Sequence, residues 1–313
     1  MYISRLYIYM FPRAYITQNW QHIHHLGLSR NTTRLPCLDR MAGKQNDLAE
    51  ALVRSGLRAE LMPQHVALVL DGNRRWAQAR GFTTPEGHEA GGVALRKIVE
   101  LSCAFGIRAV TVFGFSQENF RRPQASSHSS IRSMISVLTE EVDYIMELIE
   151  RLIRDNMDLF MREEIQVHVV GDPSRRPASL QDAAREAEEM TRSHSRYHLI
   201  LAICYSGRWD IVQACRELAT KVQDKLLRPD DIDESMLAGH LATNVLGDQL
   251  GCPDLLIRTS GELRLSNFLL WQSAYSELYF TDTLWPDFGE DEYIKALKAF
   301  QSRERRFGQR KVM

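Results

Sequence analysis

The residue types that could do chemistry are concentrated directly after runs of apolar residues. The run HVALVL (65–70) ends in Asp71 and Gly72, followed by an asparagine, two arginines and a tryptophan. The run DLLIR (254–258) is followed by TSGELRLS, which adds a second arginine and two serines. Guanidinium groups beside glycine, serine and asparagine suit phosphate, because arginine offers forked donors and glycine permits close backbone approach. The two clusters together predict a phosphate-binding site, although either one alone could be a solvated turn.

Asp71 is the only carboxylate in the first cluster. Proteins hold Mg²⁺ with one or two carboxylates, phosphate oxygens and water, so Asp71 is a candidate magnesium ligand. The alternative is that Asp71 accepts hydrogen bonds from the N-terminus of the following helix. Trp76 and Phe120 flank the polar residues, and each is either a wall of the site or an ordinary packing residue.

Elements that could position these residues alternate along the chain. Most of the strand-like runs are continuously apolar, which is typical of parallel strands covered on both faces. The runs are 65–70, 109–115, 165–170, 198–205, 254–258 and 277–280. Helical patterns lie between or after them, at 86–105, 131–163, 179–194, 208–226 and 290–306. This alternation predicts a single α/β domain with a central, mainly parallel six-stranded sheet flanked by helices. Ligands bind beyond the carboxyl ends of strands in such sheets, so the polar clusters should share one edge.

Composition excludes several classes of protein. The net charge of −1 gives no reason to expect a nucleic-acid partner. The five cysteines are scattered and form no C-x-x-C pair, which argues against a disulfide scaffold or a zinc site and for a reducing compartment. No apolar stretch approaches the roughly 18 residues of a membrane span, so no transmembrane segment is expected.

The first 45 residues differ from the rest of the chain. They contain six basic residues but a single acidic one, Asp39, together with serine and threonine. This pattern is typical of organelle transit peptides. An unstructured or wrongly assigned N-terminus is the alternative. The three histidines at positions 22, 24 and 25 lie in this leader and are expected to have no catalytic role.

Long, ordered blocks of the sequence resemble the cis-prenyltransferases, which include undecaprenyl and dehydrodolichyl diphosphate synthases. The blocks cover nearly all of residues 60–308. They are HVALVLDGNRRWA, GHEAGG, FGFSQENFRRP, CYSGRWDIVQA and DLLIRTSGELRLSNFLLWQSAYSELYFTDTLWPDF, with the tail RERRFG. The resemblance implies a transferase that condenses isopentenyl diphosphate with an allylic diphosphate, forms a cis-polyprenyl diphosphate and releases diphosphate. Residues 46–313 are then the catalytic domain, with a hydrophobic tunnel behind the strand-end site.

The same resemblance implies roles for individual residues. Asp71 and Asn119 are expected to be catalytic, and Asp71 and Glu277 to hold Mg²⁺. The expected substrate-binding residues are Gly72, Asn73, Arg74, Arg75, Trp76, His88, Ser116, Gln117, Glu118, Phe120, Arg122, Arg258, Arg264, Leu265 and Ser266. From its position alone, at the start of a helix, His88 could face phosphate or cap the helix. Gly114 and Val167 are expected in the tunnel wall, but the sequence does not predict the product length.

Location and assembly are further expectations from this resemblance. The leader and TSGELRLSNFLLWQ are similar to plant-type, plastid-directed members, with the cytoplasm or the surface of the endoplasmic reticulum as the alternative. The tail Arg306-Phe307-Gly308 fits an element that reaches the neighbouring subunit, so a homodimer is expected. Product release could involve peripheral contact with a membrane.

Three departures from the family pattern stand out. Bacterial members usually have glycine where Arg74 stands, and some members have histidine where Leu263 stands. Residues 125–140 (ASSHSSIRSMISVLTE) look like an insertion after the catalytic loop. A gene-model artefact is the alternative for this segment.

Features of the sequence argue against three alternatives to these assignments. A non-catalytic partner subunit typically loses the aspartate and the strand-end arginines, which this chain keeps. A phosphohydrolase with Asp71 as nucleophile would need a second aspartate at position 73, which is Asn73. The acidic run DDIDE (230–234) superficially resembles a metal motif, but acidic capping of a short helix explains it better.

Overall fold

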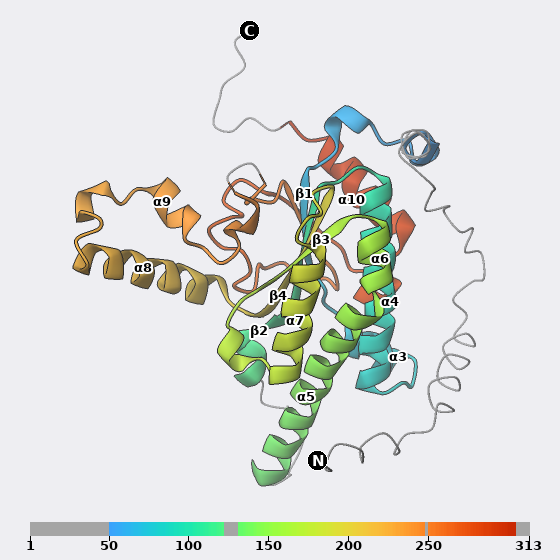
Figure 1. Ribbon diagram of the computed structural model, residues 1–313. Coiled ribbons are helices and arrows are strands. Elements are labelled where there is room, and N and C mark those ends of the chain that lie inside the picture. The colour runs from blue at the N-terminus through green and yellow to red at the C-terminus, as the bar shows by residue number, and fades with distance from the viewer. Residues whose placement is uncertain (1–49, 122–130, 248–249, 305–313) are drawn as a thin grey trace, which may run out of the picture. The chain divides into compact units, whose positions relative to one another are not determined.

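The computed structural model describes residues 50–121, 131–247 and 250–304, with residues 121 and 131–139 described by backbone alone (Figure 1). The expected leader, Arg122, residues 125–130 and the tail 306–308 lie outside the described residues. Residues 131–140 of the expected insertion belong to a helix.

A six-stranded sheet forms the centre of the fold, and every strand pair in it is parallel. The strand order is β3-β4-β2-β1-β5-β6. The strands are β1 His65–Val69, β2 Ala109–Ser116, β3 Ile165–Val170, β4 Tyr197–Tyr205, β5 Leu255–Arg258 and β6 Glu277–Phe280. The predicted fold class and the six predicted strands are therefore confirmed, each strand within about two residues at its ends.

The register of β1 and β5 places the polar cluster after β1 beside the polar cluster after β5. All five residues of β1 are buried, as expected of a central strand. Val69, the last residue of β1, is in register with Phe113 of β2 and with Arg258 of β5. Asp71 therefore follows β1 at the edge where Arg258 ends β5.

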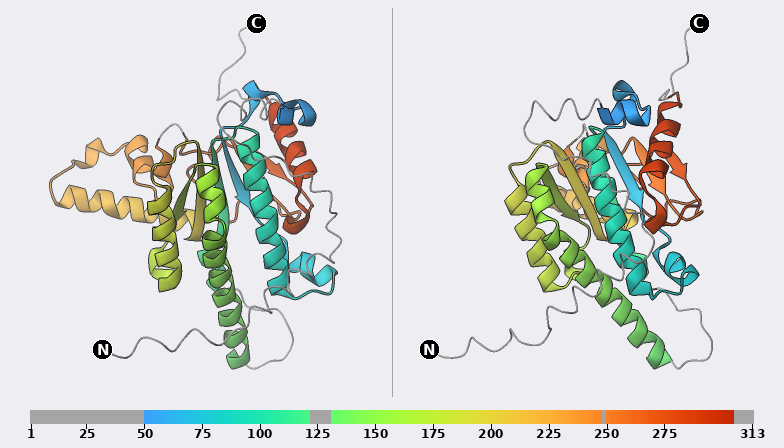
Figure 2. Two further views of the ribbon diagram at one scale, coloured as in Figure 1. Left: turned by 45° about the vertical axis from the view of Figure 1, so that its right-hand side comes forward. Right: turned by 90° about the vertical axis from the view of Figure 1, so that its right-hand side faces the viewer.

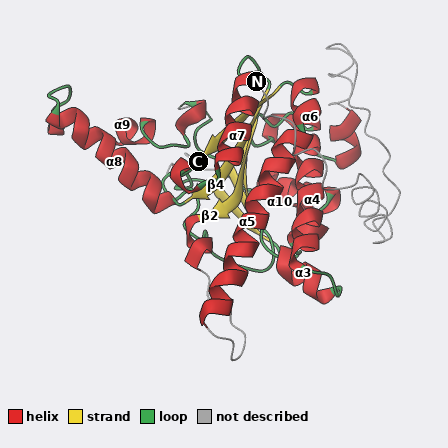
Figure 3. Cartoon of the chain, turned by 60° about the horizontal axis from the view of Figure 1, so that its bottom comes forward, coloured by secondary structure: helices red, strands yellow, loops and turns green. Residues whose placement is uncertain are grey.

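Helices surround this sheet (Figure 2). They are α3 Asn73–Ala79, α4 Thr84–Ala104, α5 Ile131–Asp155, α6 Met157–Arg162, α7 Ala178–Thr191, α8 Gly207–Gln223, α9 Glu234–Gly239 and α10 Glu290–Gln301. Helix α5 lies between α4 and α7 and contacts both, whereas α8 and α9 contact each other and extend away from the sheet (Figure 3). Among the described residues, no helix combines the length and the apolar character that crossing a membrane requires.

The predicted helix at 131–163 is two helices, α5 and α6. Asn156 separates them, and its side-chain Nδ2 donates to the carbonyl oxygen of Leu152 at 2.7 Å. Asparagine competes with helical backbone bonds in this way, which explains a break that apolar spacing does not reveal.

Helix α4 begins with a capping box. The Thr83 backbone N–H donates to the Glu86 carboxylate at 2.7 Å, and the Glu86 N–H donates back to the Thr83 hydroxyl. The box fixes the start of α4, and His88 is the fifth residue of this helix. Further along, Gly91 lies so close to α3 that an added Cβ would be 2.3 Å from Asn73 Oδ1.

Candidate active site

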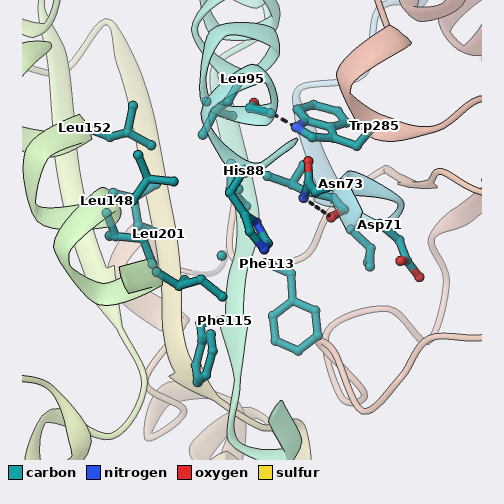
Figure 4. A pocket seen from close by; sticks show the side chains of 18 of the residues that line it. Asp71, Asn73, His88, Leu95, Phe113, Phe115, Leu148, Leu152, Leu201 and Trp285 are labelled. Atoms are coloured by element: carbon teal, nitrogen blue, oxygen red, sulfur yellow. Dashed lines mark hydrogen bonds between the residues drawn. The ribbon is translucent and has the colours of Figure 1, made fainter. Parts of the chain in front are cut away.

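A cavity of about 660 Å³ begins at the carboxyl edge of the sheet and continues between the sheet and the helices α4 and α5 (Figure 4). Its polar lining residues include Asp71, Asn73, Arg74, Arg75, His88, Ser116, Asn119, Glu141, Arg258, Glu262, Arg264 and Ser266. Its apolar lining residues include Leu95, Val99, Phe113, Phe115, Ile145, Leu148, Ile149, Leu152, Phe160, Leu199 and Leu201. The site thus joins a charged edge to a hydrocarbon-lined interior.

Asp71 is held rigidly at this edge. Its backbone N–H donates to the Thr259 hydroxyl at 3.0 Å, and its carbonyl oxygen accepts from the Thr259 hydroxyl and the Trp285 N–H. Gly72, and not Asp71, is the N-cap of α3, and no side-chain bond caps that helix. The capping alternative for Asp71 is therefore wrong.

Arg258 connects Asp71 to the second cluster. Its Nη2 donates to Asp71 Oδ2 at 2.8 Å, and its Nη1 donates to Ser266 Oγ at 2.6 Å. The side chain of Arg258 is only 4% exposed, against 33% for Asp71. The forked guanidinium fixes both partners in one plane, and the carboxylate remains reachable from the cavity.

Arg75 and Arg264 meet at a carboxylate that the sequence analysis did not single out, that of Glu262. Arg75 Nη2 lies 3.4 Å from Glu262 Oε1 and 3.6 Å from Asp71 Oδ1, and it also donates to the Ser260 hydroxyl. Arg264 pairs with the other oxygen of Glu262. Glu262 belongs to the polar segment RTSGELRLS after β5, so its position in that segment is a sequence signal for a site residue.

His88 faces the cavity (Figure 4). Thr83 and Glu86 cap α4, so the capping alternative for His88 is wrong. Its Nε2 lies 4.0 Å from Oε1 of Glu141, a cavity residue of α5 that carried no signal in the sequence.

The segment after β2 is a 3-10 helix, η2 (Gln117–Arg121). Ser116 and Asn119 line the cavity, and the Ser116 hydroxyl donates to Asn119 Oδ1 at 2.8 Å. Glu118 is instead turned to the β5–β6 loop, where its Oε1 accepts from Asn267 Nδ2 at 2.6 Å.

Five residues expected to bind substrate do not line the cavity: Trp76, Gln117, Glu118, Phe120 and Leu265. Trp76 is buried, stacks on Phe82 and donates to Asp287, so it is a packing residue in this structure. Phe120 packs edge-on against Phe115. Val167, expected in the tunnel wall, is also absent from the lining, whereas Gly114 belongs to it.

The two predicted magnesium ligands do not meet within one chain. Glu277 is in register with Leu255 at the start of β5, and Leu255 is in register with Val66 near the start of β1. Asp71 comes five positions after Val66, which is about 16 Å further along the strand direction. Glu277 is paired with Arg303, whose Nη1 donates to it at 2.6 Å.

Asp71 nevertheless suits a magnesium ion that brings its own oxygen ligands. Within the described part of the chain, no group of three or more histidine, cysteine, aspartate or glutamate side chains could hold a metal ion. Mg²⁺ needs only one or two carboxylates where phosphate oxygens and water complete its shell. Asp71, with Glu262 at the same edge, meets that requirement.

The acidic run DDIDE has a structural role. Asp233 accepts from the Met236 N–H at 2.7 Å and so caps α9, while Asp231 pairs with Arg228. The prediction of acidic capping is confirmed.

Comparison with known proteins decides the family. Residues 69–308 match the undecaprenyl diphosphate synthase family of prenyltransferases. The chloroplastic cis-prenyltransferase 4 of Solanum lycopersicum is 46% identical over 286 residues, which are 91% of this chain and 87% of that protein. The chain is a member of the cis-prenyltransferase family.

Other cis-prenyltransferases match over most of their length. A chloroplastic (2Z,6Z)-farnesyl diphosphate synthase of Solanum lycopersicum is 44% identical over 250 residues, 80% of each chain. The crystal structure of lavandulyl diphosphate synthase from Lavandula x intermedia, in complex with dimethylallyl diphosphate, superimposes with a TM-score of 0.72 at 42% identity. It covers 80% of this chain and all of that one. These relatives support a prenyl-transferring enzyme over a non-catalytic partner or a phosphohydrolase.

Proposed function

We propose that this cis-prenyltransferase condenses isopentenyl diphosphate with an allylic diphosphate primer and releases a cis-polyprenyl diphosphate and diphosphate. One observation carries the proposal: an edge with four cavity-lining arginines opens into an apolar cavity of about 660 Å³. Such a site matches a ligand that has a diphosphate at one end and a hydrocarbon chain at the other.

The allylic diphosphate would lie beside Asp71, with Arg74, Arg75 and His88 as donors to its oxygens. Its hydrocarbon chain would extend between β2 and α5, along Phe113 and Leu148. Breaking the allylic C–O bond places negative charge on the departing diphosphate, and fixed arginines stabilise that charge. The apolar walls exclude water from the resulting carbocation. These walls would form the tunnel for the growing chain.

Isopentenyl diphosphate would be bound by Arg264 and Ser266. Arg258 would act through its neighbours, because its buried guanidinium is already bonded to Asp71 and Ser266. The new C–C bond would form between the allylic carbon and the isopentenyl double bond, and a proton would then leave. Ser116 and Asn119, which line the cavity together, would position that proton for transfer to an oxygen of the released diphosphate, which would accept it.

Mg²⁺ is the proposed cofactor, and it would supply positive charge to the departing diphosphate. Asp71 would hold it, and Glu262 is the second carboxylate at the same edge. Glu277 could join only from a second copy of the chain, which agrees with the expected homodimer. Peripheral membrane contact for product release remains part of the proposal.

The chloroplastic relatives, together with the basic leader, support a plastid location for this enzyme.

The test is elongation in vitro. The protein is incubated with labelled isopentenyl diphosphate, Mg²⁺ and dimethylallyl, geranyl, neryl or farnesyl diphosphate in turn, and the products are sized by chromatography. We expect at least one primer to be extended, with loss of extension in Asp71→Ala or on chelation of Mg²⁺. A protein that extends no primer, or an Asp71→Ala variant as active as wild type, would contradict the proposal.

A further inference from the structure

Asn267 is the point where three segments of the site region meet. Its Nδ2 donates to Glu118 Oε1 of η2 and to the Ser206 hydroxyl at the end of β4, each at 2.6 Å. Its Oδ1 accepts from the Arg208 N–H at 3.0 Å, and its backbone carbonyl accepts from the Gly207 N–H at 2.7 Å. The carboxamide therefore uses both its donor and its acceptor.

The backbone conformation at position 267 also favours asparagine. Ser266 and Asn267 both have positive φ, 49° and 62°. Asparagine is among the few non-glycine residues that enter the left-handed region readily. Two consecutive residues in this region turn the chain sharply, and the Ser266 side chain is thereby brought to Arg258.

A continuous set of contacts then runs from Asp71 through the proposed isopentenyl diphosphate loop to the segment that carries Asn119. Asp71 is bonded to Arg258, Arg258 to Ser266, and the next residue, Asn267, to Glu118. Glu118 immediately precedes Asn119, which lines the cavity. Neither Asn267 nor Glu118 lines the cavity, so this bond can act only through its neighbours.

We propose that Asn267 is a positioning residue that fixes the catalytic segment, Ser116–Asn119, relative to the loop that binds isopentenyl diphosphate. This inference rests on the proposed function. Loss of the Asn267 side-chain bonds should disturb the loop and the catalytic segment together. We expect a higher KM for isopentenyl diphosphate, through Ser266, and a lower kcat, through Asn119. A residue that only stabilises α8 would change the melting temperature and leave the kinetics of the folded enzyme intact.

The direction of the bond allows a sharp test. Asn267→Asp keeps an asparagine-like shape, the tolerance for positive φ and an acceptor for the Arg208 N–H. It removes the donor and sets one carboxylate against another at Glu118. In the double variant Asn267→Asp/Glu118→Gln, the bond can form again with its polarity reversed, because the new amide can donate to the new carboxylate.

The four proteins of this cycle are compared by kcat, by KM for isopentenyl diphosphate and by melting temperature. In the wild-type background, we expect Asn267→Asp to lower kcat/KM by at least tenfold. In the Glu118→Gln background, we expect the fold-loss in kcat/KM from the same substitution to be roughly ten times smaller. A difference of this size is typical of the coupling between residues in contact. Asn244→Asp, a change of the same type in the 3-10 helix Asn244–Leu246 outside the cavity, is the matched control and should have no such effect.

Equal losses in both backgrounds would overturn the inference, as would a loss confined to the melting temperature. A wild-type protein that elongates no primer would instead contradict the proposed function, so the two failures are distinguishable.

Discussion

Arg258 carries a positive charge that is almost completely buried, which is costly unless the guanidinium is paired and hydrogen-bonded. It is bonded to Asp71, to Ser266 and to the carbonyl oxygen of Arg264. A planar fork is needed to reach a carboxylate and a hydroxyl at the same time. Its burial makes Arg258 an organiser of the site more than a direct ligand.

Arg258→Lys tests this requirement at constant charge. A lysine ammonium on a flexible stem cannot reproduce the fork, so we expect kcat/KM for isopentenyl diphosphate to fall about 100-fold, a loss of roughly 2.7 kcal/mol of transition-state stabilisation. Steady-state kinetics measure it. Arg196→Lys is the matched control, because the exposed guanidinium of Arg196 pairs with the buried Glu163 outside the cavity. If lysine supports full activity at position 258, charge alone suffices there.

Gly91 shows a steric limit of the site. An added Cβ would lie 2.3 Å from Asn73 Oδ1 and 3.1 Å from the Trp285 ring, and contacts under 3.0 Å force something to move. Asn73 lines the cavity beside Asp71, and its Oδ1 is buried with no hydrogen-bond partner among the described residues.

Gly91→Ala is therefore expected to displace Asn73. We expect a lower kcat and a melting temperature reduced by several degrees, the scale of a loss of about 1 kcal/mol. Gly289→Ala, where an added Cβ meets nothing within 4 Å, should be near wild type. An alanine at position 91 without effect on either quantity would show that the two helices separate easily.

At the scale of elements, β2, α4 and α5 enclose the cavity. Gly114 of β2 lines it, and a Cβ there would have only ordinary contacts, the nearest at 3.6 Å from the Ala202 carbonyl oxygen. The position thus has room for a side chain, which would extend toward Ile149 of α5.

Filling this space should shorten the product. We expect Gly114→Leu to shift the product distribution by at least one isoprene unit, and Gly114→Ala to give an intermediate distribution, because each added carbon removes volume from the proposed tunnel. Product sizes are compared by chromatography at equal isopentenyl diphosphate consumption. An unchanged distribution in Gly114→Leu would mean that the growing chain takes another path.

At the scale of the whole molecule, the buried His65 and the half-buried His168 link stability to pH. Burial lowers the pKa of His65 to about 4, and the pKa of His168 likewise to about 4. His65 is bonded on both ring nitrogens, to the Leu250 carbonyl oxygen and to the Thr111 hydroxyl. Both histidines are therefore neutral in the folded protein at pH 7.

Acid should destabilise the fold through these groups. The unfolded chain binds a proton on each histidine near the ordinary pKa of 6.5, whereas the folded chain does so only near 4. The contribution of these two histidines to the free energy of unfolding is fully present above pH 6.5. It is lost progressively as the pH falls from 6.5 toward 4. Urea unfolding between pH 8 and pH 5 measures it, and His65→Gln should flatten the slope even if overall stability is lower. An equally steep slope in that variant would assign the effect to other groups.

The expected leader, residues 1–45, predicts where the chain is located in the cell. Residues 1–45 fused to a fluorescent protein should direct it into chloroplasts, because an arginine-bearing, acid-poor segment suits plastid import. A fusion in which Arg5, Arg13, Arg30, Arg34 and Arg40 are replaced by glutamine is the control and should remain outside. Cytosolic fluorescence of the unmodified fusion would favour the alternative location.

Local sequence patterns predict the strands and most residues of the candidate site. Continuously apolar runs identify strands covered on both faces, and the residues after them must share one edge because parallel strands end together. Asp71, Arg258, Arg264 and Ser266 were found in this way, and all of them line the cavity. These are local signals, carried by the spacing of a few neighbouring residues.

Which of these residues are in contact follows from the tertiary fold and cannot be predicted from local patterns. Asp71 and Arg258 are 187 residues apart and meet because β1 and β5 are neighbours in the strand order. Glu277 begins β6, so it lies at the amino edge of the sheet, opposite the edge that carries Asp71. The contact of Asn267 with Glu118 likewise joins positions 149 residues apart. Strand neighbours are chosen by packing and backbone hydrogen bonds across the entire domain, and no local pattern encodes that choice.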